Sequence, residues 1–316
     1  MAKTLITSIG IENDAMGIRA AKISITRTGS KARIQVAGLS ELRGDFSADE
    51  SIAGAMKKIK EKIGISASDR VVTCLSGKQV YVAQLPFRKL PELEMKNALK
   101  LEIKKNLPFE VAGASIDYQQ VEGTRKDDMF QIIVTAVPGV LLSRHLNMLE
   151  RLSIKPWVVD VLPLAIANAF HLSQKSFAIG LAYIIVHIGP AVVNLIICGD
   201  ENIPFFHRSI YFSSEEVFGG EPPPEESAIE KRLGDLASEI TRSLSFYEKT
   251  LSNSSFAGVF LMGEYLDRGD AFKNVIGNKT NLTTEVVDVF PRLKQTSNAP
   301  KGKFEVAMAL AMRNSE

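Results

Sequence analysis

Two segments of the sequence combine a glycine with side chains that could act on an anionic ligand. Residues 10–14 read Gly-Ile-Glu-Asn-Asp, and residues 187–190 read His-Ile-Gly-Pro. Glycine lets backbone N–H groups approach a phosphate closely, and a carboxylate at a strand end can orient Mg²⁺ and water. The same glycines also fit ordinary hairpin turns, so the pattern indicates either an anion site or two plain turns.

Other kinds of site chemistry have no matching pattern in this sequence. The four histidines lack metal-ligand spacing, and His187 at the end of an apolar strand fits a packed, hydrogen-bonded side chain better than a ligand. Cys74 and Cys198 stand alone in apolar runs, which is typical of buried thiols in a reducing compartment. There is no P-loop, Rossmann fingerprint, zinc motif or nucleophile elbow. We therefore expect no metal site and no catalytic residue.

The composition is that of a soluble globular protein. The chain has 316 residues, 45% of them hydrophobic and 23% charged, with a formal net charge of +2. This charge is too balanced to favour nucleic acid as a partner. The N-terminus lacks the pattern of a signal peptide, and the most apolar stretch, 179–188, is far shorter than the roughly 20 residues of a spanning helix. We expect a cytoplasmic protein.

An approximate internal duplication sets the predicted architecture. The first half predicts strands at 4–9, 18–26 and 33–38 and a helix at 47–63, and the second half predicts strands at 183–188, 192–198 and 204–212 and a helix at about 228–251. Residues 219–226, which include three consecutive prolines, predict a stiff acidic loop before that last helix. Two such repeats predict a two-lobed α/β fold with a cleft between the lobes.

A segment between the halves is not required by the duplication. It predicts strands at 79–85, 115–121 and 129–137, with helices at 91–107 and 140–152. Residues 123–128 form a polar turn between the last two of these strands. We interpret 79–153 as an inserted small α+β subdomain.

Five stretches, in order along nearly the whole chain, match one family pattern. They include Leu90-Pro91-Glu92-Leu93-Glu94-Met95 with Leu107-Pro108-Phe109, then Asp117-Tyr118-Gln119, Val159-Asp160-Val161-Leu162-Pro163-Leu164-Ala165, Phe246-Tyr247-Glu248, and Ala309-Leu310-Ala311-Met312-Arg313. Together they resemble the PilM family of type IV pilus assembly, which is itself similar to the division protein FtsA and to actin. The resemblance rests on all five stretches and on their shared order.

The resemblance implies an actin-like, ribonuclease H-like duplicated fold with an FtsA-type inserted α+β subdomain. Residues 1–78 plus 154–178 would form the first lobe (subdomain 1A), and residues 79–153 would form the insert (1C). Residues 179–316 would form the second lobe (2A, with a 2B-like part at about 213–250).

The resemblance also implies a nucleotide cleft, which is degenerate here. Its positions are Gly10, Glu12, Asn13, Asp14, His187, Gly189, Asn194, Gly263 and Glu264. Asp14 puts a carboxylate where the family has a phosphate-binding glycine, and this charge repels a triphosphate. His187 replaces a Mg²⁺-binding acid, and Glu264 replaces the second glycine of the adenosine turn. We expect a pseudo-ATPase with no catalytic residues and no obligatory cofactor, and weak binding of ATP and Mg²⁺ stays open.

The family's behaviour implies a peptide partner. We expect the chain to bind the short cytoplasmic tail of a PilN-like inner-membrane protein in a groove between the first lobe and the insert, and the pilus assembly ATPases are further candidate partners. The residues expected to contact this tail are Leu107, Pro108, Phe109, Asp160 and Pro163. The protein would then associate with the inner membrane only through its partners.

Three other functions remain as alternatives to this adaptor. The first is a nucleotide-gated switch of the same machinery, in which ATP binding controls assembly. The second is the equivalent platform subunit of type II secretion. The third is an FtsA-like filament former, which the sequence favours less because no basic amphipathic tail is present.

Overall fold

The computed structural model describes most of the chain. The described residues are 4–14, 16–28, 31–44, 49–88, 90–121, 129–174, 177–200, 203–218, 225–264, 268–290 and 302–313. The predicted polar turn at 123–128 and most of the predicted proline-rich loop at 219–226 lie outside the described residues.

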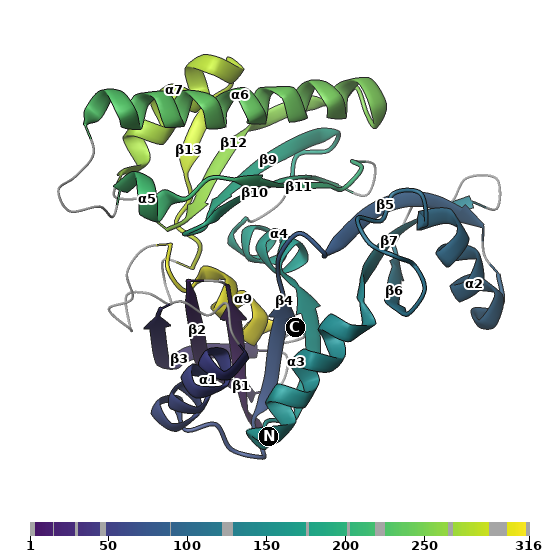
Figure 1. The fold of residues 1–316 in the computed structure, drawn as a ribbon, viewed down its shortest axis with the longest axis vertical. Coiled ribbons are helices and arrows are strands. Elements are labelled where there is room, and N and C mark those ends of the chain that lie inside the picture. Colours follow the sequence, from purple (N-terminus) through teal and green to yellow (C-terminus); the bar gives the residue numbers. More distant parts are fainter. Residues whose placement is uncertain are drawn as a thin grey trace. The chain divides into compact units, whose positions relative to one another are not determined.

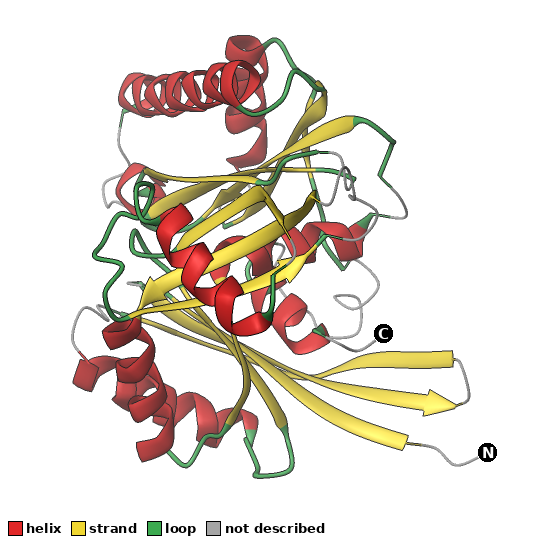
Figure 2. Ribbon diagram, turned by 90° about the vertical axis from the view of Figure 1, so that its right-hand side faces the viewer, coloured by secondary structure: helices red, strands yellow, loops and turns green. Residues whose placement is uncertain are grey.

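A mixed five-stranded sheet contains the N-terminal strands. Its strands are β1 (Thr4–Asn13), β2 (Gly17–Thr28), β3 (Lys31–Arg43), β4 (Arg70–Leu75) and β8 (Pro156–Val161), in the order β3-β2-β1-β4-β8. The first three strands are antiparallel, whereas β4 and β8 run parallel to β1 and to each other. The strands β1, β2 and β3 extend as a long ribbon toward the N-terminus (Figure 2).

A second five-stranded sheet repeats this topology. Its strands are β9 (Leu181–Ile188), β10 (Val192–Cys198), β11 (Phe206–Tyr211), β12 (Ser255–Gly263) and β13 (Thr284–Val286), in the order β11-β10-β9-β12-β13. The strands β9, β10 and β11 are antiparallel, and β12 and β13 continue in parallel. The predicted duplication is therefore present in strand order and in strand direction. Figure 1 shows the two sheets with their labelled strands.

Helices pack on both sheets through apolar side chains that recur at helical spacing. On the first sheet these are α1 (Asp49–Ile63) and α3 (Gly139–Arg151), whose Met56, Ile59 and Leu149 join the core with Ile9 and Ile11. The second sheet is covered by α6 (Glu226–Thr250) and α7 (Gly269–Thr280), and the short α5 (Ser214–Phe218) precedes α6.

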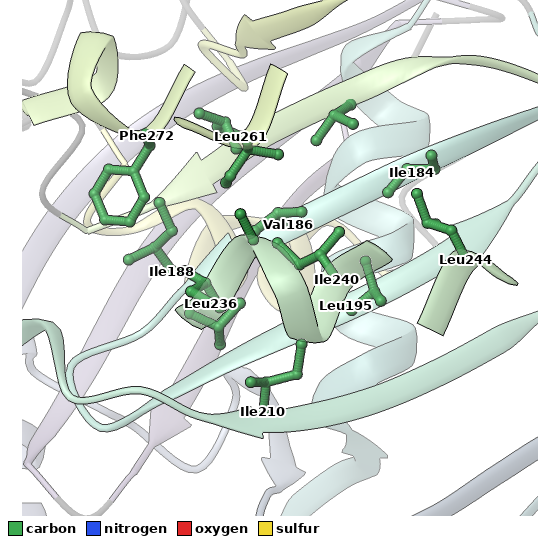
Figure 3. Close-up of a cluster of buried hydrophobic side chains, with 14 of the residues drawn as sticks. Ile184, Val186, Ile188, Leu195, Ile210, Leu236, Ile240, Leu244, Leu261 and Phe272 are labelled. Carbon is green, nitrogen blue, oxygen red and sulfur yellow. The ribbon is translucent and has the colours of Figure 1, made fainter. Parts of the chain in front are cut away.

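The core of the second sheet illustrates how this packing arises. The strand β9 is buried along almost its whole length, which is typical of a central strand with both faces covered. Its alternate residues Ile184, Val186 and Ile188 point toward Leu236, Ile240 and Leu244 on α6 (Figure 3). The predicted stripe on the long helix is confirmed, since these three leucine and isoleucine side chains are buried.

The inserted segment forms a small sheet with one helix. Its elements are β5 (Tyr81–Arg88), α2 (Glu92–Ile103), β6 (Ala114–Gln120) and β7 (Met129–Pro138), and the strand order is β5-β7-β6. The stripe of Met95, Leu99 and Ile103 on α2 packs against Ile132 and Val134 of β7. The predicted helix extended to Leu107, but α2 ends at Ile103 and the chain continues in turns.

The chain divides into two compact units that differ from the predicted lobes. The first unit comprises 1–76, 143–175 and 288–316, and the second comprises 77–142 and 176–287. The sequence predicted that 288–316 belongs to the second lobe and 143–153 to the insert, whereas both segments belong to the first unit. Within the second unit, the Gln84 side chain of β5 accepts a hydrogen bond from the Phe205 backbone N–H at 3.0 Å, which ties the inserted sheet to the segment before β11.

The C-terminal helix explains why 288–316 belongs to the first unit. This helix, α9 (Glu305–Met312), packs on β1, β2 and β4 and on α4 (Leu162–Ser173). Its apolar residues from Val306 to Ala311 are buried, as expected of a core helix. A Cβ at Gly10 would lie 1.9 Å from the Ala307 carbonyl oxygen, so only glycine permits this approach.

Candidate functional site

The first candidate turn joins β1 to β2 and is closed by its own hydrogen bonds. The Asp14 backbone N–H donates to the Gly17 carbonyl at 2.9 Å, and the Asp14 Oδ1 accepts from the Met16 N–H at 2.7 Å. The Ser76 hydroxyl donates to the Asn13 carbonyl at 3.0 Å. The N–H groups of Asp14 and Met16 are thus used within the turn.

A buried arginine, which sequence reasoning did not identify, organises the acids around this turn. Arg19 on β2 is only 2% exposed. Its Nη1 lies 3.0 Å from the Asp14 Oδ2 and 3.8 Å from the Glu12 Oε1, and its Nε lies 3.4 Å from the Glu41 Oε1. Arg19 faces Glu12 because the antiparallel register of β1 and β2 pairs these two residues directly. Sequence reasoning missed Arg19 because this register is not visible in the local sequence of either strand.

The cluster continues from Glu41 toward the C-terminal segment. The Glu41 carboxylate pairs with the Arg43 Nε at 3.0 Å and with the Lys303 Nζ at 2.8 Å. Partial burial acts to raise the pKa of Glu41, but the hydrogen bonds from Lys303 and Arg43 outweigh it and hold this pKa below its ordinary value. Glu41 therefore stays ionised and links the turn to the residues that precede α9.

Glu12 has a perturbed protonation equilibrium. Burial raises the pKa of its carboxyl from 4.5 to about 7, while Arg19 lowers it and Asp14, Glu305 and Glu41 raise it further. The balance reflects an acid that is 4% exposed beside one guanidinium and several other carboxylates. Glu12 is a titratable group near neutral pH, but its nearest charged neighbours are protein side chains.

Gly10 has a different role from either of those predicted. It lies within β1 and not in the turn, and its bare Cα faces α9. The glycine is required for helix packing, so this position gives no support to an anion site.

The second candidate turn joins β9 to β10 and is closed by neutral groups. The Gly189 N–H donates to the Val192 carbonyl at 3.1 Å, and the Gly189 carbonyl accepts from the buried Ser214 hydroxyl at 2.7 Å. The Glu264 N–H donates to the Ile188 carbonyl at 2.7 Å. The structure therefore places Glu264 beside Ile188 and the start of this turn.

Gly263 is required by backbone geometry at this same point. Its φ is +103°, and a Cβ would lie 2.3 Å from the Ile188 carbonyl oxygen. Such a backbone conformation is open to glycine and strained for other residues. Both the close approach and the positive φ thus account for this glycine.

Asn194 and His187 lie side by side across β9 and β10. The register aligns Met262, His187, Asn194 and Ser209 across four strands. The Asn194 Oδ1 lies 3.2 Å from both the His207 Nε2 and the Ser209 Oγ. Burial lowers the pKa of His207 to about 4, so this imidazole is neutral at physiological pH. His207 and Ser209 were missed from the sequence because only the strand register brings them to Asn194.

The residues expected to contact a peptide lie in both units. In the second unit, Leu107 and Phe109 are half-buried and pack against the core of the inserted sheet, whereas Pro108 is exposed. In the first unit, Asp160 and Pro163 are buried where β8 ends and α4 begins.

Asp160 is held by interactions within the first unit. Its Oδ1 accepts from the Val161 N–H at 2.8 Å, and its Oδ2 pairs with Arg313 just after α9. These contacts join β8 to the end of the C-terminal helix. They give Asp160 a structural role within the first unit.

The described residues contain no three His, Cys, Asp or Glu side chains close enough together to hold a metal ion. Over the same part of the chain, no helix is both long and apolar enough to cross a membrane.

Comparison with known proteins identifies the family. The family model described as type IV pilus assembly protein PilM matches residues 15–229, which is more than half of the chain. The chain belongs to the PilM family. The predicted resemblance is therefore confirmed, although no curated protein sequence matches the chain significantly.

Solved structures agree with this assignment at the level of the fold. A structure described as the PilM-PilN type IV pilus biogenesis complex has a TM-score of 0.79 at 19% identity, covering 98% of both chains. A Bacteroides thetaiotaomicron protein with an actin-like ATPase fold and unknown function has a TM-score of 0.52 at 10% identity, covering 97% of this chain and 95% of its own.

A third similar structure is the ethanolamine utilization protein EutJ from Carboxydothermus hydrogenoformans. It has a TM-score of 0.52 at 9% identity, covering 99% of this chain and 90% of its own. At these identities the likeness establishes the fold alone. The predicted actin-like fold of this PilM family member is confirmed.

Proposed function

We propose that this PilM family chain is a non-enzymatic adaptor that binds the cytoplasmic tail of a PilN-like membrane protein during type IV pilus assembly. The observation that carries the proposal is the likeness, over 98% of both chains, to a structure described as a PilM-PilN complex. The adaptor would reach the inner membrane through this partner.

The inserted sheet supplies features suited to an extended peptide. In the strand order β5-β7-β6, β5 lies next to the segment before β11, which leaves β6 as the outer strand among the described residues. Extended peptides add to edge strands through main-chain hydrogen bonds and place alternate side chains in nearby pockets. The half-buried Leu107 and Phe109 offer apolar surface beside the exposed Pro108 on the same small subdomain.

The nucleotide site of the fold is proposed to be non-functional. A Mg²⁺-nucleotide needs free backbone donors and unpaired acids at the first turn. Here the N–H groups of Asp14 and Met16 are used within the turn, and Arg19 already pairs with Asp14 and Glu12. These residues do not fit a Mg²⁺-nucleotide as they are arranged.

A calorimetric titration tests the adaptor role. The probe is a synthetic peptide with the N-terminal cytoplasmic residues of the PilN-like protein from the same genome. We expect wild-type protein to bind it. We expect Phe109→Ala to weaken binding by about tenfold or more, because truncating an aromatic hot-spot residue costs about 2 kcal/mol or more and about 1.4 kcal/mol is tenfold.

Two controls make this titration decisive. Phe246→Ala removes an aromatic that is 53% exposed on α6 and should leave the affinity unchanged. Because Phe109 packs on the insert core, circular dichroism must show that the Phe109→Ala protein is folded, and Pro108→Ala supplies a variant at an exposed position. A folded wild-type protein that does not bind the peptide contradicts the adaptor proposal.

Thermal unfolding with ATP and Mg²⁺ tests the nucleotide proposal separately. A ligand at 100 times its dissociation constant adds about 2.7 kcal/mol to the free energy of unfolding. We expect no such stabilisation at millimolar ATP and Mg²⁺, and no phosphate release above the rate of the buffer. Magnesium-dependent turnover that is lost in Glu12→Gln would favour the nucleotide-gated switch instead.

A further inference from the structure

The acids of the first turn converge on a single buried cation. The Asp14 Oδ2 and the Glu12 Oε1 both face the same nitrogen of Arg19, Nη1, while Glu41 faces its Nε. These three carboxylates come from β1, from the turn after it and from β3, so they are separate in the sequence. A fourth acid, Glu305 of α9, is 1% exposed and acts electrostatically on Glu12.

Such a group of acids requires positive charge in order to stay buried. Burying a carboxylate without a partner costs several kilocalories per mole, and like charges close together add to that cost. In proteins that bind Mg²⁺ between carboxylates, the ion supplies this charge, with oxygens at about 2.0–2.1 Å. Here the guanidinium supplies it from the neighbouring strand, at hydrogen-bonding and ion-pairing distances of 3.0–3.8 Å.

The guanidinium is also held in place far more firmly than an exchangeable ion. Arg19 is 2% exposed and lies near the start of β2, a strand that is paired on both sides, with Glu12 on β1 and Glu41 on β3 as its register partners. Burial acts to lower its pKa, but Glu12, Asp14 and Glu41 raise it above the ordinary value, so the side chain remains charged. The positive charge is therefore permanent and covalently attached.

We propose that Arg19 occupies the position of a bound divalent cation and is the residue that excludes Mg²⁺-nucleotide from the first turn. This inference deepens the proposed loss of nucleotide binding and rests on that part of the proposed function. The Asp14 carboxylate also accepts a hydrogen bond from the turn backbone, and the Glu41 carboxylate also pairs with Lys303. Through these two acids, the Arg19 guanidinium stabilises both the turn and the segment that leads into α9. The first unit then keeps its arrangement without any ligand.

The proposal predicts a change of ligand when the arginine is removed. Arg19→Met keeps an apolar stem and deletes the charge, which leaves Asp14, Glu12 and Glu41 facing one vacancy. Hard divalent cations with oxygen ligands are the class of ion suited to that vacancy. In EDTA we expect a clear loss of thermal stability, and millimolar Mn²⁺ should restore several degrees of melting temperature to this variant only.

Electron paramagnetic resonance of Mn²⁺ gives a direct readout of binding. We expect Arg19→Met to bind about one Mn²⁺ per chain at least tenfold more tightly than wild type. The matched control is Arg242→Met, which removes an arginine whose side chain is 68% exposed and whose ion pair with Glu239 lies on the surface of the same helix. This control should show neither the destabilisation nor the Mn²⁺ response.

A second variant keeps the test informative if Arg19→Met does not fold. Arg19→Met/Asp14→Asn removes the closest carboxylate, so it should be more stable in EDTA than the single variant and should lose the Mn²⁺ response. The proposal is overturned if Arg19→Met is as stable as wild type in EDTA, or if neither Mn²⁺ nor the Asp14→Asn change recovers its stability. Stabilisation of wild type by Mg²⁺ and ATP would instead refute the proposed loss of nucleotide binding, so the two failures are distinguishable.

Discussion

The hairpin between β1 and β2 and the hairpin between β9 and β10 hold equivalent places in two sheets of the same strand order. The first is surrounded by charge, with Arg19 between Asp14, Glu12 and Glu41. The second is closed by neutral contacts, in which Gly189 bonds to Val192 and Ser214. The two hairpins therefore share a topology but differ in their chemistry. The strand order depends on buried apolar residues, whereas each turn depends on a few polar residues.

The two hairpins should respond to different perturbations. A change of the backbone should affect the second hairpin most, because the main chain of Gly263 lies directly against the main chain of Ile188 at the end of β9. A change of charge or pH should affect the first hairpin most.

Gly263→Ala tests the backbone side of this comparison and should have the largest effect. We expect a loss of about 4 kcal/mol in the free energy of unfolding, because alanine adds strain at positive φ and a clash with a carbonyl oxygen. Urea unfolding measures it. Gly234→Ala in α6 is the control, since a Cβ there meets nothing within 4 Å, and it should stabilise by about 0.5–1 kcal/mol. Equal effects at both glycines would show that the second turn does not depend on its backbone.

Glu12→Gln tests the charged side through pH. The pKa of Glu12 is about 7 in the folded protein against an ordinary 4.5, so the folded state retains this proton where the unfolded state has lost it. The wild type should therefore lose stability as pH rises from about 4.5 to 7, by an amount on the order of 2 kcal/mol, and Glu12→Gln should abolish this loss.

Two histidines provide an internal check on the sign of that effect. Burial lowers the pKa of both His145 and His207 to about 4, so their contribution to stability is lost as pH falls from about 6.5 to 4. That acid-side loss should persist in Glu12→Gln. Urea unfolding at pH 5 and pH 8 separates the two trends, and an unchanged difference between these pH values in the variant would show that Glu12 does not titrate as inferred.

Ser214→Ala should have the smallest effect of the three. It removes a hydroxyl that is fully buried and donates to the Gly189 carbonyl, which leaves that acceptor without its side-chain donor. We expect a loss of about 1–2 kcal/mol. Ser238→Ala, which removes a bond to the Gly234 carbonyl within a helix, is the matched control and should change stability by less. A larger loss of stability in the control would show that the Ser214 hydroxyl does not stabilise the second hairpin.

Local patterns were sufficient to predict several elements of the fold. The strand-like runs at β1 and β10 and the stripe from Leu233 to Leu244 on α6 predicted strands and a helix within a few residues of their observed bounds. The duplication was visible because both halves repeat three strands and a helix. The family match and the actin-like fold agree with that interpretation.

The position of an element in the sequence did not predict which other elements it packs against. The α3 helix was assigned to the insert, but Met148, Leu149 and Leu152 pack with the first sheet. Gly10 was interpreted as a turn glycine or a phosphate-binding glycine. Its missing side chain instead lets α9, almost 300 residues later in the chain, pack closely on β1. Arg19 was overlooked because an arginine on a strand has no local signature of burial.

By itself, the sequence determined the periodicity of the strands and helices, the repeated order of elements, and which turns carry acids, imidazole or proline. These properties depend on neighbouring residues and on the burial of apolar side chains. Tertiary structure alone decided that Arg19 would meet Glu12, Asp14 and Glu41, and that the C-terminal helix would close the first sheet. Both depend on contacts between distant segments, where strand register and close backbone approach determine which charges and which glycines come together.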